Sequence, residues 1–152
     1  MKLTLFQKIV TVFENQEHQV FTRRQIIEKL QKKYKKIKPG SINLTDFCYN
    51  RTRSGTKFHK HPRLFNYDGK NRYEYLGYGF RYLGLIYQRK KGEKEDLVVG
   101  DWLYGREVIY DDGYYLFIKD IRKRIIDSLR SIYYNSSYPK ERITNRPDKN
   151  AV

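Results

Sequence analysis

The sequence predicts an α+β protein, with three helices and a β-hairpin in its first half, then a small antiparallel sheet and a C-terminal helix. Three observations predict this order. Apolar residues recur at helical spacing in two N-terminal segments, and the second segment opens with a capping box. Asp68–Asn71 separates two aromatic segments as a hairpin turn does. Short aromatic and β-branched segments follow, before helical spacing returns at Ile118.

The first expected helix covers residues 3–13. Its apolar residues Phe6, Ile9, Val10 and Phe13 are three or four positions apart, which places them on one face of a helix. Residues 14–19 break this pattern. We therefore expect one helix with a single apolar face.

The second expected helix begins at Thr22, whose hydroxyl can cap it. Gln25 can reach back to the backbone N–H of Thr22, and Phe21 can pack on Ile26 as a hydrophobic staple. Pro39-Gly40 ends the helical pattern. The outward face and the helix exit carry five lysines: Lys29, Lys32, Lys33, Lys35 and Lys36.

A short third helix is expected between Ser41 and Arg51, with Ser41 or Asn43 as its cap. Its apolar residues Leu44, Phe47 and Cys48 would face the core, which leaves the polar residues outward. Residues 62–67 and 72–76 then flank the turn and form the hairpin.

This order of elements in residues 3–77 resembles winged helix-turn-helix domains. The strings that carry the resemblance are Ser41-Ile42-Asn43, Asp46, Cys48-Tyr49-Asn50, Leu64-Phe65-x-Tyr67-x-Gly69 and Tyr73-x-Tyr75-Leu76-Gly77. They look similar to small winged-helix modules found alone or fused to restriction-type nucleases. The resemblance covers about half of the 152 residues. It implies binding to duplex DNA, with the third helix in the major groove and the hairpin as a wing on the backbone or in the minor groove.

The charge favours a nucleic-acid partner. The chain has 32 basic and 17 acidic side chains, a formal net charge of +15. Residues 1–77 contribute +11 of this and residues 78–152 contribute +4. A localised basic surface attracts polyanions and gains affinity by releasing counterions from phosphates. The alternative is a surface that serves only solubility.

The candidate contact residues follow from this docking mode, because side chains on a recognition helix reach base edges and cations around it hold phosphates. The candidate readers of bases are Asn43, Thr45, Asp46, Tyr49, Asn50 and Arg51. The candidate phosphate contacts are Arg53, Lys57, Lys60 and Arg63, with Lys70, Asn71 and Arg72 at the wing tip.

Several of these residues have a structural alternative. Asp46 could cap its own helix, Tyr49 could belong to the core, and Asn50 could cap the helix C-terminus. Each cation could instead lie on an ordinary solvated surface.

The second half is expected to contain strands at residues 80–88, 97–102, 106–110 and 114–117, with a turn at Tyr110–Tyr114 between the last two. Helical spacing predicts a helix from Ile118 to Tyr134. The predicted domains are a nucleic-acid-binding domain at 1–77, a sheet and helix at 78–134, and a flexible basic tail at 135–152. The middle domain serves either as a homodimer or partner surface or only as its own core.

The sequence indicates no cofactor, no metal, no small-molecule ligand and no membrane partner. His59 and His61 lack carboxylate or thiol ligands beside them, and no 18-residue apolar run occurs. Cys48 is the single cysteine, so an intrachain disulfide is impossible and a cytoplasmic location is expected, in the host cytoplasm for a viral chain.

The favoured hypothesis is a non-catalytic DNA-binding protein with a regulatory or recognition role in a microbe or virus. One alternative is a small nuclease, or the recognition subunit of one, that uses a divalent metal at Asp101, Glu107, Asp111 and Asp112. The other is an RNA or general polyanion binder, in which tyrosines stack on unpaired bases.

Overall fold

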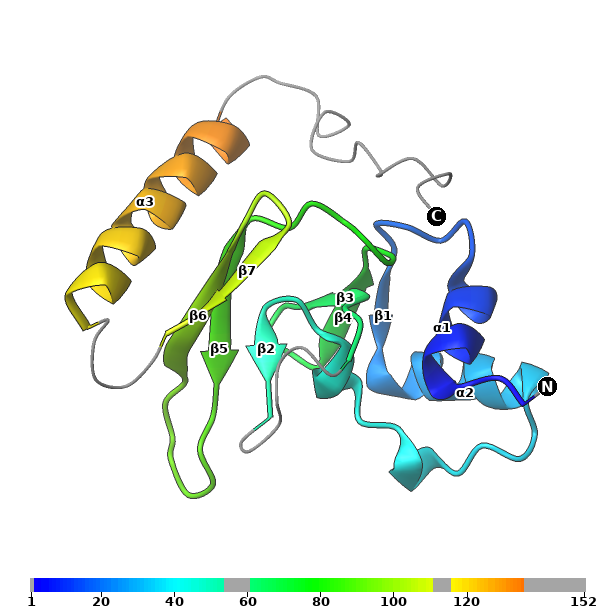
Figure 1. Ribbon diagram of the computed structural model, residues 1–152. Coiled ribbons are helices and arrows are strands. Elements are labelled where there is room, and N and C mark those ends of the chain that lie inside the picture. The colour runs from blue at the N-terminus through cyan, green and yellow to red at the C-terminus, as the bar shows by residue number, and fades with distance from the viewer. Residues whose placement is uncertain (1, 54–60, 111–115, 136–152) are drawn as a thin grey trace. The chain divides into compact units, whose positions relative to one another are not determined.

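The computed structural model describes residues 2–53, 61–110 and 116–135 (Figure 1). The chain divides into two compact units. Unit 1 comprises Met1–Arg51 and Gly55–Tyr78, and unit 2 comprises Thr52–Ser54 and Gly79–Val152. The described residues form three α-helices: α1 Leu5–Phe13, α2 Arg23–Lys33 and α3 Leu116–Asn135. No described helix combines the length and the hydrophobicity that crossing a membrane requires.

Unit 1 contains a three-stranded antiparallel sheet of order β1-β4-β3. Its strands are β1 Val20–Thr22, β3 Phe65–Tyr67 and β4 Arg72–Tyr75. The β3–β4 pair, with Phe65 opposite Tyr75, confirms the predicted hairpin. β1 lies on the other side of β4, with Thr22 opposite Arg72. This strand was not expected from the sequence, because its three residues directly precede the first turn of α2.

The core of unit 1 is aromatic and aliphatic. Ile9 and Phe13 from α1, Ile26 from α2 and Phe65 from β3 are fully buried. The Phe13 ring packs against Phe65, with 6.0 Å between centroids. Burying an aliphatic or aromatic side chain contributes about 1.5–3 kcal/mol, so this cluster is the main reason why α1 and α2 hold to the sheet.

The predicted winged helix with three helices and a hairpin is wrong, because residues 41–51, where its third helix was expected, form no α-helix. Residues 39–52 form a 3-10 turn η1 Pro39–Ser41, a second turn η2 Leu44–Phe47, and the short strand β2 Arg51–Thr52. Asn, Thr and Asp are poor helix formers, and η2 has no side-chain cap. The backbone N–H of Tyr49 donates to Phe65 O at 2.8 Å, so the chain pairs with β3 where the helix was expected.

A second sheet has four strands in the order β2-β5-β6-β7. Unit 2 contains β5 Gly84–Gln88, β6 Leu97–Leu103 and β7 Arg106–Ile109, together with Thr52 of β2. The pairs β5–β6 and β6–β7 are antiparallel. α3 packs against β5 and β6 (Figure 1). Ile126 of α3 is buried, whereas Ile121, Ile125 and Ile132 are exposed, and the predicted homodimer stays a prediction.

Three of the four strands predicted in the second half are present, as β5, β6 and β7. The strand predicted at 114–117 is wrong in its described part, because Leu116 and Phe117 open α3. A short apolar run fits a strand or a helix equally well, and here it continues the helical spacing of residues 118–134. The predicted turn residues 111–114 and tail residues 136–152 lie outside the described residues.

Candidate nucleic-acid interface

A dense positive charge lies on α2 and the segment that follows it. Between Arg23 and Lys38, eight side chains are basic and only Glu28 is acidic, a net charge of +7 out of +15 for the chain. The inward residues Ile26, Ile27 and Leu30 are buried, so the cations occupy the remaining faces. We call the following residues the α2 basic surface: Arg23, Arg24, Lys29, Lys32, Lys33, Lys35, Lys36 and Lys38.

The two arginines of this surface have structural partners. Arg24 Nε lies 2.7 Å from Glu28 Oε1, and Arg23 Nη2 donates to Ile42 O at 3.3 Å. Five lysines of the α2 basic surface are exposed and form no ion pair with any acidic side chain in the described part of the chain. They are Lys32, Lys33, Lys35, Lys36 and Lys38. These ammonium groups are therefore available to an external anion.

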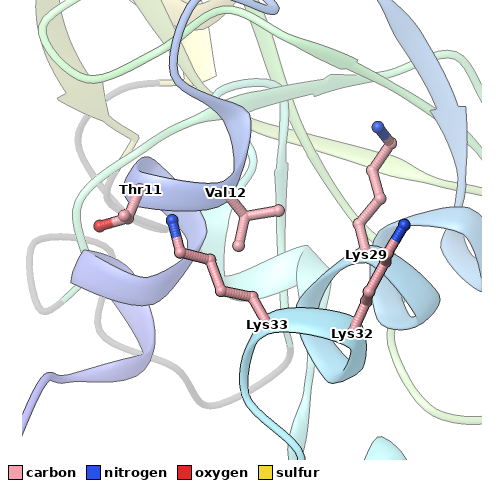
Figure 2. A pocket seen from close by; sticks show the side chains of 5 residues that line it. All are labelled: Thr11, Val12, Lys29, Lys32 and Lys33. Carbon is pink, nitrogen blue, oxygen red and sulfur yellow. The ribbon is translucent and has the colours of Figure 1, made fainter.

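α1 and α2 line an open groove of about 350 Å³ between Thr11, Val12, Lys29, Lys32 and Lys33 (Figure 2). Figure 2 shows the Lys33 side chain extending toward α1, whereas Lys29 and Lys32 lie on the other side of the groove. Three ammonium groups around one groove repel one another, and a bound anion would relieve this repulsion.

Lys29 is held in place by its neighbours. Its Nζ donates to Gln16 Oε1 at 3.0 Å and lies 5.2 Å from the centroid of the Phe21 ring. Lys32 and Lys33 belong to the last turn of α2, where the helix dipole favours cations. The lysines thus also stabilise the helix that carries them, so their position alone does not require a ligand.

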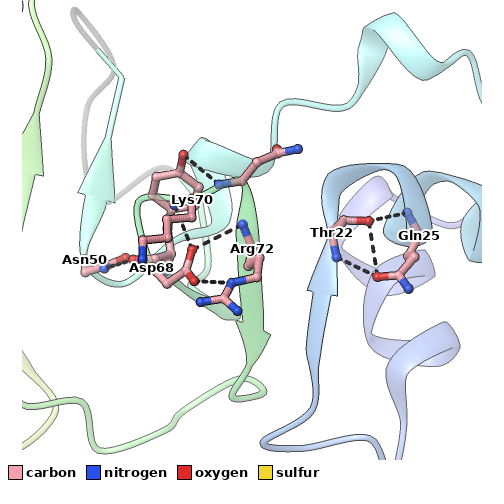
Figure 3. A network of polar contacts seen from close by, with 8 residues as sticks. Thr22, Gln25, Asn50, Asp68, Lys70 and Arg72 are labelled. Atoms are coloured by element: carbon pink, nitrogen blue, oxygen red, sulfur yellow. Dashed lines mark hydrogen bonds and ion pairs between the residues drawn. The ribbon is translucent and has the colours of Figure 1, made fainter.

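A capping box fixes the N-terminus of α2, as the sequence predicts (Figure 3). Thr22 Oγ1 accepts a hydrogen bond from the backbone N–H of Gln25 at 3.2 Å. Gln25 Oε1 in turn accepts one from the backbone N–H of Thr22 at 2.8 Å. The reciprocal bonds satisfy two of the free donors at the helix start.

The wing-tip candidates Lys70, Asn71 and Arg72 are exposed at the β3–β4 turn. Figure 3 shows Lys70 and Arg72 beside Asp68. Asp68 organises this turn, because its Oδ1 accepts from the backbone N–H of Lys70 at 2.9 Å and its Oδ2 from Arg72 Nε at 2.5 Å. Asn71 adopts φ 58°, a left-handed conformation that asparagine tolerates. The Arg72 guanidinium is therefore already paired, while the Lys70 side chain is exposed.

The candidate readers Tyr49, Asn50 and Arg51 are directed into unit 1. Tyr49 is 2% exposed, and its hydroxyl donates to Gly77 O at 3.0 Å. The Asn50 side-chain amide donates to Tyr67 O at 2.6 Å and accepts from the backbone N–H of Tyr67 at 2.9 Å. The Arg51 guanidinium lies 4.9 Å from the centroid of the Tyr67 ring. These residues do not form an outward helical face.

The remaining candidates are scattered. Asn43 and Thr45 are half-buried around η2, and Arg53 is exposed. Arg63 is 5% exposed, and its Nη1 donates to Asp46 O at 3.0 Å, so this arginine supports η2 from within. Lys57 and Lys60 lie outside the described residues. The structure therefore does not bring the predicted readers and phosphate contacts together on one surface.

A buried charge cluster in unit 2 involves Asp101, a residue of the nuclease alternative. Asp101 is 0% exposed, and its two oxygens accept from Arg122 Nε and Nη2 at 2.7 Å each. Tyr110 donates its hydroxyl to Asp101 Oδ2 at 2.5 Å. Burial and this hydrogen bond raise the pKa of Tyr110 above its ordinary value. The hydrogen bonds to Asp101 raise the pKa of Arg122.

This cluster leaves Asp101 little capacity to bind a metal, because a guanidinium and a hydroxyl occupy its oxygens. Glu107 lies on β7, half-buried, while Asp111 and Asp112 lie outside the described residues. In residues 2–53, 61–110 and 116–135, no three His, Cys, Asp or Glu side chains group as a metal site would. No observation favours the nuclease alternative.

The lysines of α2 were expected as the outward face of the second helix and not as site residues, because the expected docking mode uses residues 41–72. A simple signal could have selected them, since eight of the 16 residues from 23 to 38 are basic.

Comparison with known proteins gives a family and one relative. The family model described as "Domain of unknown function (DUF7225)" matches residues 4–109. The chain is 37% identical over 103 residues to "Uncharacterized protein YnaC" of Bacillus subtilis (strain 168), an alignment that covers 68% of this chain. The chain spans 38% of the length of that relative. No solved structure matches the chain significantly.

Proposed function

We propose that this chain, which belongs to the DUF7225 family, is a non-catalytic nucleic-acid-binding protein whose α2 basic surface contacts phosphates. One observation carries the proposal: the net charge of +7 between residues 23 and 38, where five exposed lysines have no described acidic partner. Such a surface concentrates polyanions near it and gains binding free energy from released counterions.

The chemistry of these residues indicates which property of the ligand they recognise. An ammonium group is a flexible point charge that suits a phosphate but does not distinguish base edges. The α2 basic surface should therefore bind with little sequence preference and with a strong dependence on salt. The groove between α1 and α2 supplies a concave site for one phosphate, and the exposed lysines beyond it can follow the backbone.

The test compares two variants with the same change in charge. One variant replaces Lys32, Lys33 and Lys36 with Gln, and the control replaces three exposed lysines of the β5–β6 connection with Gln. The control residues are Lys90, Lys91 and Lys94. Binding of the full chain to a short fluorescent duplex is measured by anisotropy at several salt concentrations.

We expect the α2 variant to bind the duplex more weakly. The slope of the logarithm of its association constant against the logarithm of the salt concentration should become shallower by about 0.9 for each phosphate that the variant no longer neutralises. The control variant should bind within about twofold of the unchanged chain, because its lysines lie among Glu93, Glu95 and Asp96. Equally weakened binding in both variants would show that only the overall charge matters. The proposal would be refuted if the chain without substitutions did not bind the duplex in a salt-dependent way.

A further inference from the structure

The β6–β7 hairpin carries a tyrosine at its tip in an unfavourable backbone conformation. Leu103 pairs with Arg106, which leaves Tyr104 and Gly105 as a two-residue loop. Their φ angles are 51° and 82°, so both central residues are left-handed. This is the geometry of a type I′ turn, for which Asn-Gly or Asp-Gly is the favoured pair.

A bulky side chain with positive φ is a true outlier, and such residues are retained where the surrounding structure fixes them. The backbone N–H of Gly105 donates to Tyr82 O at 3.2 Å, and Tyr82 is 6% exposed. The turn is thus attached to a buried residue. The Tyr104 side chain, in contrast, is 57% exposed, so burial of apolar area does not compensate for the strained backbone.

Two arginines lie close to this turn. Arg106 follows the turn directly on β7, and Arg81 lies beside it, with its Cα and Cγ 3.7 Å from the position of a Cβ on Gly105. Both arginines are exposed, and neither forms an ion pair with a described acidic side chain. An exposed aromatic ring on a turn with two arginines close by fits an unpaired base and its adjoining phosphates.

We infer that Tyr104, with Arg81 and Arg106, is a stacking site for an unpaired base of a single-stranded nucleic acid. This inference rests on the proposed function and specifies its ligand class. The α2 basic surface of unit 1 would hold phosphates of any strand. The hairpin of unit 2 would add affinity only where a base is free to leave the duplex and stack.

The strained turn makes a clean experiment possible. Tyr104→Asn removes the ring but supplies a residue that the turn favours, so the Tm should stay equal or rise. Tyr104→Phe retains the ring. Each full-length variant is titrated with three fluorescent probes: a pyrimidine single strand, the same strand with abasic sites, and a duplex of equal length. The abasic strand keeps the phosphates and lacks the bases.

We expect Tyr104→Asn to weaken binding to the pyrimidine strand about 5- to 150-fold, since that is the range for one stacked base. Binding to the abasic strand and to the duplex should change by less than about twofold, and Tyr104→Phe should bind all probes normally. Unchanged binding of Tyr104→Asn to the pyrimidine strand would overturn the inference. An equally large decrease on all three probes would overturn it too, because the ring would then not act on bases.

The two proposals fail in different ways. In the first case the chain without substitutions binds nucleic acid, and replacing Lys32, Lys33 and Lys36 weakens this binding. If Tyr104→Asn then binds the pyrimidine strand normally, only the stacking site is refuted. If the unchanged chain binds none of the probes, the proposed function is refuted and the stacking site with it.

Discussion

Arg122→Met should destabilise unit 2 strongly, because the Arg122 guanidinium neutralises a carboxylate that water does not reach. Asp101 is 0% exposed, and Arg122 donates to both of its oxygens at 2.7 Å. Methionine keeps most of the apolar stem of arginine and removes only the charged group. Among the described side chains, Asp101 would then keep a single donor, the Tyr110 hydroxyl.

The size of the effect follows from burial. Removing one member of a buried ion pair costs about 3–5 kcal/mol, because the remaining charge is buried without compensation. The Arg122 side chain is 26% exposed, so water can replace part of the interaction and the lower end of that range, about 3 kcal/mol, is expected. For a chain of this length, such a destabilisation lowers the Tm by about 6–12 °C.

The assay is thermal and urea unfolding of the full chain, followed by circular dichroism. Arg124→Met is the matched control, since Arg124 lies on the same helix but is exposed. The free energy of unfolding should fall by less than about 0.5 kcal/mol in the control. If Arg122→Met were no less stable than Arg124→Met, Asp101 would not depend on the guanidinium, and the reasoning would be wrong.

Three further predictions concern stability. Burial raises the pKa of the Cys48 thiol from 9.0 to about 12. The neutral thiol therefore contributes its full stability below pH 9, and this contribution disappears as the pH rises toward 12. The urea midpoint should fall between pH 9 and 12, and it should fall less in Cys48→Ala. Thr22→Ala removes the cap of α2 and should lower the free energy of unfolding by about 1 kcal/mol in urea titrations, against little change for Thr11→Ala. Gly100→Ala places a Cβ against Val108 O and should lower the Tm, whereas Gly40→Ala, with open space around it, should not.

The sequence predicts those elements of this fold whose signals are local. α1, α2 and the β3–β4 hairpin appear where apolar spacing, the Thr22 capping box and the Asp68 turn place them. Each of these signals involves residues within a few positions of one another, so tertiary contacts do not have to be known. The cations of the candidate surface are equally readable, because their exposure follows from the buried face of α2.

The elements that could not be predicted depend on partners far along the chain. Several polar groups of residues 46–50 bond to residues 63–67, as in the bond from Tyr49 N–H to Phe65 O and that from Leu64 N–H to Phe47 O. β1 is a strand only because β4 lies beside it. Apolar residues such as Leu44 and Phe47 are buried in either arrangement, so hydrophobic spacing could not distinguish a helix from a 3-10 turn and an extended segment.

The pairing of β1 with β4 also determines when unit 1 can fold during synthesis. Thr22 and Arg72 face each other in the sheet but are 50 residues apart in the chain. At translation rates of about 5–20 residues per second, the partner of β1 emerges on the order of 3–10 s after β1 itself. Until then Phe13, Phe21 and Ile26 lack the strands that cover them. The nascent chain therefore exposes these apolar side chains for seconds before the sheet of unit 1 can cover them.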